Sequence, residues 1–158
     1  MKHALLILLV SIVSSSMFAQ KFTSYTFEEL QPMLHKKSDT VYVINFWATW
    51  CAPCIKEIPY FNKAFMKYEN RPVAIYMVSL DFGTKVASRL ANFKTKHNML
   101  PKILHLDDPD SNSWINKVDP NWSGALPATM IYRNNNASFY EKTFEYEELI
   151  QAIESKLK

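Results

Sequence analysis

A nearly continuous apolar run spans residues 41–47 and is rich in β-branched and aromatic side chains. This composition suits a strand that is covered on both faces, as in a parallel sheet. A second run of this kind spans 73–78, and a shorter one spans 102–106. The three runs predict strands of one buried sheet.

Apolar residues recur at helical spacing between and after these runs. Residues 52–68 show this spacing between the first two strands, which predicts a strand-helix-strand crossover unit. A capping box, Thr26 with Glu29 three positions later, indicates the start of a further helix. The predicted helices are 26–36, 52–68, 84–97 and 145–157. Helices that alternate with buried strands indicate the α/β class.

The remaining part of the chain, 107–142, reads as a loop followed by a hairpin. Residues 107–121 are polar and contain proline and asparagine, so we expect a loop with one helical turn at 114–118. Residues 129–133 and 138–142 alternate like strands about Asn134-Asn135-Asn136, and asparagine tolerates the positive φ of a hairpin turn. No repeat or linker interrupts the pattern, so we predict a single domain over 20–158.

The first residues have the layout of a secretory signal: a short basic start, an apolar run at 4–13, and then small polar residues. A membrane-spanning helix needs about 18 or more apolar residues. We therefore predict a signal peptide at 1–19 that is cleaved after Ala19. An uncleaved anchor is the alternative, because Met17 is larger than the residue preferred at that position before a cut. Export would place the cysteines where a disulfide can persist.

Composition narrows the possible functions of this 158-residue chain. It holds only two glycines, so neither a GxGxxG dinucleotide turn nor a glycine-rich phosphate loop can be present. The net charge is +3, from 18 basic and 15 acidic residues without a long basic run, so we expect no nucleic-acid partner. Two cysteines cannot form a four-sulfur zinc site, and we predict no metal centre.

The two cysteines, Cys51 and Cys54, stand directly after the first strand and at the start of the long helix. Free backbone N–H groups and the positive end of the helix dipole stabilise a thiolate on Cys51 there. Cys54 lies one helical turn later, within disulfide reach, and could resolve a mixed disulfide formed by Cys51. Pro53 suits the first turn, where its missing N–H costs nothing. The arrangement predicts redox chemistry.

Two other interpretations of the cysteine pair stay open. A disulfide that closes so short a loop contributes only about 2 kcal/mol in the chain-entropy model, so it would be a weak structural staple. A pair of soft thiolates could instead bind Cu(I).

The segment Asn45-Phe46-Trp47-Ala48-Thr49-Trp50-Cys51-Ala52-Pro53-Cys54 resembles the active site of TlpA/ResA-like thiol-disulfide oxidoreductases of the thioredoxin superfamily. Pro59 matches a proline inside the first long helix of that fold, and Leu126-Pro127 matches its cis-proline segment. The resemblance extends from about Tyr42 to the C-terminus. It implies a thioredoxin fold, with a mixed central β-sheet and helices on both faces.

The resemblance also implies a role for Glu57. Cytoplasmic thioredoxins carry a buried acid six positions before the first cysteine, where this chain has Asn45. ResA-like proteins place a glutamate six positions after it, and here that residue is Glu57. Glu57 stands three residues after Cys54, so we expect it to exchange a proton with that thiol. The alternative is an ordinary solvated helix glutamate.

We expect a substrate-binding surface around the cysteines. A cis Leu126-Pro127 bond would place its loop beside the sulfur atoms, although Leu126 replaces the β-branched residue often found there. Trp50 and Trp47 could form an apolar rim, but Trp47 suits the core equally well, and Trp122 could join this rim from the preceding loop. The predicted binding residues are Trp50, Pro53, Leu126, Pro127 and Trp122.

These expectations combine into a disulfide reductase that needs no cofactor beyond its own Cys51–Cys54 pair. The resemblance implies exported disulfide-containing client proteins such as apocytochromes, a membrane electron donor, and a periplasmic or cell-envelope location. A monomer is expected. The alternatives are an oxidase that donates its disulfide, and a non-enzymatic thioredoxin-fold module that binds Cu(I) or a protein partner.

Overall fold

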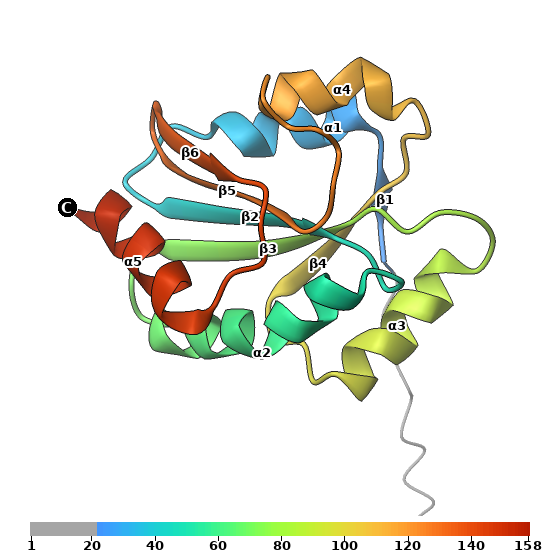
Figure 1. Cartoon of the computed structure of the whole chain (residues 1–158), viewed down its shortest axis with the longest axis horizontal. Helices are drawn as coiled ribbons and strands as arrows, with labels where there is room; N and C mark the ends of the chain where they lie inside the picture. Colours follow the sequence, from blue (N-terminus) through green and yellow to red (C-terminus); the bar gives the residue numbers. More distant parts are fainter. Residues whose placement is uncertain (1–21) are drawn as a thin grey trace, which may run out of the picture.

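The computed structural model describes residues 22–158. A six-stranded mixed sheet forms its centre, with strand order β1-β4-β3-β2-β5-β6, and helices cover both faces (Figure 1). The signal peptide predicted at 1–19 lies outside the described residues. Among residues 22–158, no helix combines the length and the apolar character needed to cross a membrane.

The strands divide into a parallel half and an antiparallel half that meet at β2. The parallel pairs are β1 with β4, β4 with β3, and β3 with β2, whereas β5 pairs antiparallel with both β2 and β6. The strand bounds are β1 Ser24–Tyr25, β2 Val41–Trp47, β3 Val73–Ser79, β4 Lys102–Leu106, β5 Ala128–Arg133 and β6 Asn136–Tyr140. This order places β2, which leads to the cysteines, in the interior of the sheet.

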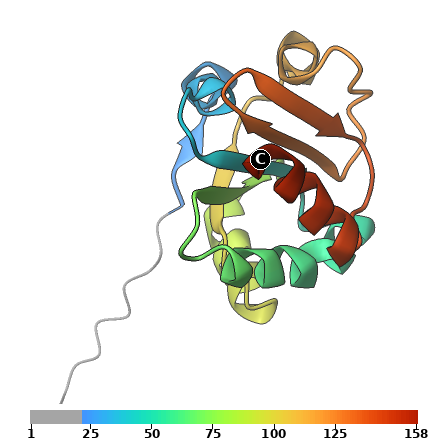
Figure 2. The ribbon, with the colours of Figure 1, turned by 90° about the vertical axis from the view of Figure 1, so that its left-hand side faces the viewer.

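The helices form two layers, as the view along the sheet shows (Figure 2). Helices α2, α3 and α5 pack on one face, and α1, η1 and α4 pack on the other. Their bounds are α1 Phe27–Leu30, the 3₁₀ helix η1 Gln31–His35, α2 Ala52–Lys67, α3 Val86–Lys96, α4 Ser111–Val118 and α5 Tyr146–Leu157.

Every residue of β2 is buried, and successive side chains enter opposite cores. Val41, Val43 and Trp47 join the core beneath α2, whereas Ile44 and Phe46 join the core beneath α4. This alternation follows from the two-residue period of a strand.

Most predicted elements are confirmed, and three differ. The Thr26 capping box is present, but the helix continues from Gln31 as a 3₁₀ helix because Pro32 has no N–H for an α-helical bond. The single turn predicted at 114–118 was too short, since α4 begins at Ser111. In the hairpin, Asn134 adopts the expected positive φ of 54°, but Asn136 already belongs to β6. Strand β1 was not predicted.

Candidate active site

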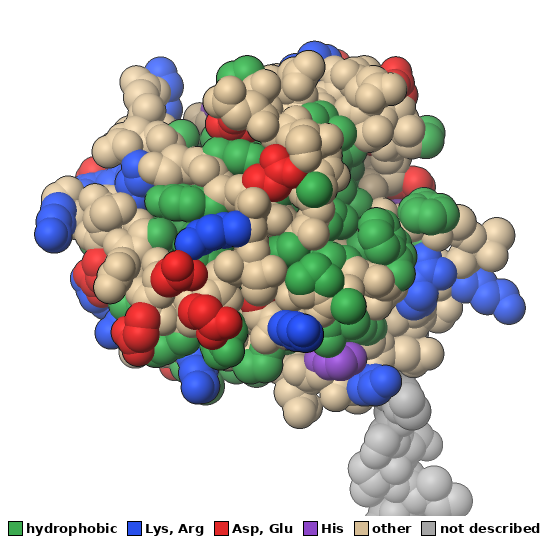
Figure 3. All heavy atoms as spheres, in the orientation of Figure 1, with side chains coloured by type: hydrophobic (Ala, Val, Ile, Leu, Met, Phe, Trp, Pro, Cys, Tyr) green, Lys and Arg blue, Asp and Glu red, His purple; other side chains and the backbone are tan. Residues whose placement is uncertain are grey.

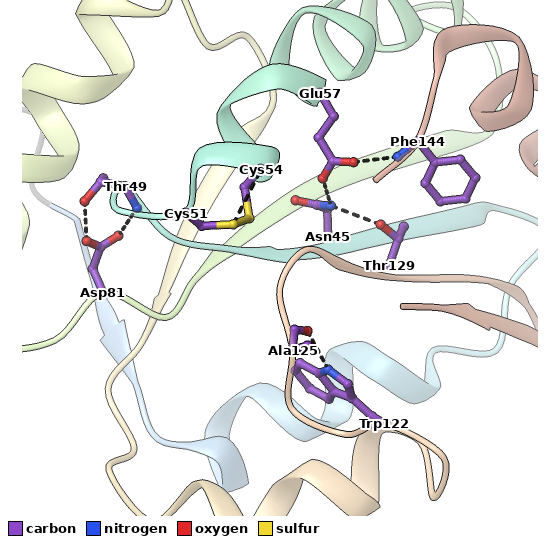
Figure 4. The surroundings of a disulfide bond; sticks show 10 residues. All are labelled: Asn45, Thr49, Cys51, Cys54, Glu57, Asp81, Trp122, Ala125, Thr129 and Phe144. Carbon is purple, nitrogen blue, oxygen red and sulfur yellow. Dashed lines mark hydrogen bonds between the residues drawn. A yellow bond between two sulfur atoms is a disulfide. The ribbon is translucent and has the colours of Figure 1, made fainter. Parts of the chain in front are cut away.

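Cys51 and Cys54 form a disulfide bond at the start of α2 (Figure 4). Cys51 is the N-cap residue, and the backbone N–H of Cys54 donates to its Sγ atom at 3.3 Å. Pro53 occupies the first turn. The first sulfur therefore lies where the sequence places it, at a helix N-terminus whose N–H groups favour a thiolate.

The two sulfurs differ in their access to solvent. Cys54 is completely buried, whereas Cys51 is 5% exposed and lines a surface hollow of about 450 Å³. The other residues around this hollow are Trp50, Ala52, Pro53, Leu80, Gly124, Ala125 and Leu126. A partner protein can therefore reach Cys51 but not Cys54.

The opposite wall of the hollow is the loop before β5. The Leu126-Pro127 bond is cis, as predicted. Leu126 lines the hollow and Pro127 is buried behind it. Leu126 thus shares the hollow with Cys51.

Of the three tryptophans considered for the apolar rim, only Trp50 lies on it, with 59% of its surface exposed. Trp47 is fully buried in the core, the alternative that the sequence left open. The placement of Trp122 on an exposed rim was wrong, because its ring is buried against Phe46 and Phe139. Its indole N–H donates to the Ala125 carbonyl at 2.9 Å, so Trp122 supports the loop from beneath.

Glu57 is completely buried, which excludes the solvated alternative. Asn45 of β2 donates through Nδ2 to Glu57 Oε1 at 2.8 Å and to Thr129 Oγ1 at 3.0 Å. The backbone N–H of Phe144 donates to Glu57 Oε2 at 2.9 Å. Burial raises the pKa of Glu57 to about 7, although both hydrogen bonds oppose the rise. Near neutral pH this carboxyl group can therefore both release and accept a proton.

Asn45, the partner of Glu57, carries an unpaired polar atom. Its Oδ1 atom is buried and has no hydrogen-bond partner within residues 22–158. In Figure 4 this oxygen lies on the side of the amide that faces Cys54. Asn45 thus contacts the buried acid through its nitrogen while its oxygen stays without a partner.

A second buried carboxylate, Asp81, was not predicted. It follows β3 and accepts hydrogen bonds from the Thr49 N–H at 2.9 Å, the Thr49 hydroxyl, and the Ser79 hydroxyl at 2.8 Å. Arg89 Nε also donates to it at 3.2 Å. Thr49 is two residues before Cys51, so Asp81 fixes the turn that carries the cysteine. An acidic residue two positions after a largely apolar strand was the sequence signal for it.

No group of three His, Cys, Asp or Glu side chains that could hold a metal ion occurs within residues 22–158. The chemistry that the described residues bring together is one accessible sulfur, one buried sulfur and a titratable carboxyl group.

Comparison with known proteins agrees with this arrangement. Residues 17–136 match the AhpC/TSA family. The thiol-disulfide oxidoreductase ResA of Oceanobacillus iheyensis is 31% identical over 109 residues, which is 69% of this chain and 48% of that protein. The chain spans about half or less of the length of the curated relatives it matches.

Solved structures confirm the thioredoxin fold. A thioredoxin-related protein from Neisseria meningitidis serogroup B superimposes with a TM-score of 0.65 at 24% identity, covering 77% of this chain and 86% of that one. A secreted Mycobacterium tuberculosis disulfide oxidoreductase homologous to E. coli DsbE gives 0.60 at 19% identity, covering 87% and 97%. From the match over residues 17–136, we conclude that the chain belongs to the AhpC/TSA family, and its fold is that of thioredoxin.

Proposed function

We propose that this protein is a thiol-disulfide oxidoreductase that reduces disulfides in other proteins. The observation that carries the proposal is the difference between the two cysteines: Cys51 lines a surface hollow at a helix N-terminus, while Cys54 is completely buried. The matched relatives, which are named thiol-disulfide oxidoreductases, support the same chemistry.

In the first step the Cys51 thiolate attacks one sulfur of a client disulfide. A bond forms between Cys51 and that sulfur, and the other client sulfur leaves as a thiolate that takes a proton from water. The helix N-terminus assists this step because it stabilises the attacking thiolate.

In the second step Cys54 attacks the sulfur of Cys51. The Cys51–Cys54 disulfide forms, the bond to the client breaks, and the client leaves with two thiols after receiving two electrons. Cys54 must first lose its proton in a buried site, where its charged form is disfavoured. Glu57 receives that proton, since its pKa of about 7 suits a proton acceptor at neutral pH. Asn45 holds the Glu57 carboxyl group in place through the hydrogen bond from its Nδ2.

The proposed setting is the cell envelope. The proposal takes exported proteins with disulfides as clients, apocytochromes among them, and a membrane-bound carrier of electrons as the donor that restores the dithiol. The described secretion of the Mycobacterium tuberculosis neighbour supports an exported location. We also propose that the protein acts as a monomer and that it needs no cofactor other than its own cysteine pair.

The test is the equilibrium of the pair with glutathione together with two cysteine variants. A potential near or below about −270 mV, that of thioredoxin, supports a reductase. A much higher potential indicates an oxidase, and a pair that resists all exchange indicates a binding module.

The variants test the assigned roles of the two sulfurs. Cys51→Ser should abolish reduction of a disulfide-bonded protein. Cys54→Ser should accumulate a mixed disulfide through Cys51. Undiminished turnover by Cys51→Ser would overturn the proposal.

A further inference from the structure

Two exposed aromatic side chains stand next to the cysteine pair. Trp50 is 59% exposed and Phe82, in the loop after β3, is 73% exposed. Their ring centroids lie 6.2 Å apart in an edge-to-face arrangement. Among residues 22–158, the other large exposed apolar side chains are Phe65, Met66 and Leu100. We call the pair of Trp50 and Phe82 the aromatic ledge.

The ledge is held in position by its backbone. The Phe82 carbonyl accepts a hydrogen bond from Arg89 Nη2 at 2.8 Å, and Gly83 provides the positive φ of 89° that turns the chain after Phe82. Arg89 also pairs with the buried Asp81 carboxylate. Because Asp81 binds Thr49 as well, one network fixes the chain beside both rings. The ledge is therefore a preorganised surface.

A hollow of about 380 Å³ lies along the ledge. It shares Leu80 and Gly124 with the hollow at Cys51, so the two hollows are neighbours on the surface. Apolar side chains gather on this face, between α4 and α3 (Figure 3). The apolar residues that line the second hollow are Leu80, Phe82, Leu106, Pro109, Trp114, Ile115 and Trp122.

The charged residues around this hollow are all acidic. Asp81, Asp107 and Asp108 line it, and no lysine, arginine or histidine of the described residues does so. Asp81 is paired with Arg89, and Asp108 accepts the Phe27 N–H at 3.1 Å, whereas Asp107 is exposed. The exposed Asp107 carboxylate therefore favours a basic neighbour and disfavours an acidic one.

We propose that the aromatic ledge and its hollow select clients that carry a bulky apolar side chain next to the attacked cysteine, followed by a basic residue. This inference rests on the proposed reductase function and names its substrate class. The client segment lies extended over Cys51, and its apolar side chain enters the hollow against Phe82. The selectivity resides in client binding, since no residue of the ledge carries out the exchange.

The experiment uses four short peptides, each with one cysteine joined to glutathione by a disulfide. The residue next to the cysteine is Trp or Ser, and the residue after it is Lys or Glu. With the wild type, we expect kcat/KM to be about tenfold higher for the Trp peptides than for the Ser peptides, mainly through KM. The Lys peptides should exceed the Glu peptides about threefold at low salt.

Two variants and a matched control locate this selectivity. Phe82→Ala should reduce the Trp-over-Ser ratio severalfold, and Asp107→Lys should invert the Lys-over-Glu preference. Met66→Ala is the control, because Met66 is 57% exposed but lies in the last turn of α2, far along the helix from Cys51. It should leave both ratios unchanged.

The outcomes separate the two proposals. If the wild type exchanges with none of the peptides, the proposed function itself fails. The second outcome is that the wild type exchanges with all four peptides, and that Phe82→Ala and Met66→Ala show the same Trp-over-Ser ratio of kcat/KM. In that case the ledge does not select clients, and this inference is overturned.

Discussion

The buried Glu57 makes the stability of the folded protein depend on pH, and Glu57→Gln isolates that dependence. The folded pKa is about 7, whereas the ordinary value is 4.5. Between these values the unfolded chain has lost its proton and the folded chain keeps it. Folding stability therefore falls as pH rises through this interval, because the folded state binds more protons. Glutamine cannot ionise, so the variant does not show this loss of folding stability as the pH rises.

The size of the effect follows from the two pKa values. At about 1.4 kcal/mol per pKa unit, the interval from 4.5 to about 7 corresponds to roughly 3 kcal/mol. The difference in unfolding free energy between Glu57→Gln and the wild type should therefore shift in favour of the variant by roughly 3 kcal/mol from pH 4 to pH 8. Most of the gain should appear between pH 5 and 7.

Urea unfolding of the oxidised proteins at steps from pH 4 to pH 8 measures this difference. All other titrating groups are shared, so subtraction removes them. Glu148→Gln is the control, because Glu148 is exposed and Lys142 lowers the pKa of its carboxyl group, which gives a dependence of opposite sign. A difference between wild type and Glu57→Gln that stays constant with pH would refute the reasoning.

Two further predictions concern the supports of the active site. Thr49→Val removes the hydroxyl that donates to buried Asp81 and should cost about 1.5–3 kcal/mol of unfolding free energy, whereas Thr49→Ser should restore most of it. Urea unfolding and the pH profile of Cys51 alkylation check this, and equal stability of the two variants would contradict it. Trp122→Phe keeps a ring in the core but loses the donor to Ala125, which should cost about 1 kcal/mol and raise the client KM. A KM identical to that of the wild type would show that the Ala125 loop needs no such support.

The elements that could be predicted from the sequence are those whose signal is local. Both ends of strand β2 were predicted correctly. All seven of its positions are buried, and burial on both faces produces the nearly continuous apolar run seen in the sequence. Cys51 was placed at a helix start because strand, turn and helix follow one another within a few residues. Thr26 likewise reveals its helix through a partner only three positions away.

The features that were missed depend on contacts between distant parts of the chain. Strand β1 has two residues, and only its pairing with β4, 81 positions later, makes it a strand. Trp122 was expected to join the apolar rim from its loop, but its ring packs in the aromatic core beneath α4. Asp81 has Ser79 as a nearby partner, but the contact that ties it to the cysteine turn is with Thr49, which lies 32 positions before it.

Both cysteines belong to the hydrophobic core on the α2 side of the sheet, together with side chains from α5. The oxidation state of the pair is therefore also a property of the core. The folded and unfolded chains, each oxidised or reduced, are the four states of a thermodynamic cycle that links folding to oxidation of the pair. If the core accommodates one oxidation state better by about 1.4 kcal/mol, the midpoint of the folded couple moves by about 30 mV from that of the unfolded chain. Core substitutions far from either sulfur can thus change the reduction potential of the pair through packing alone.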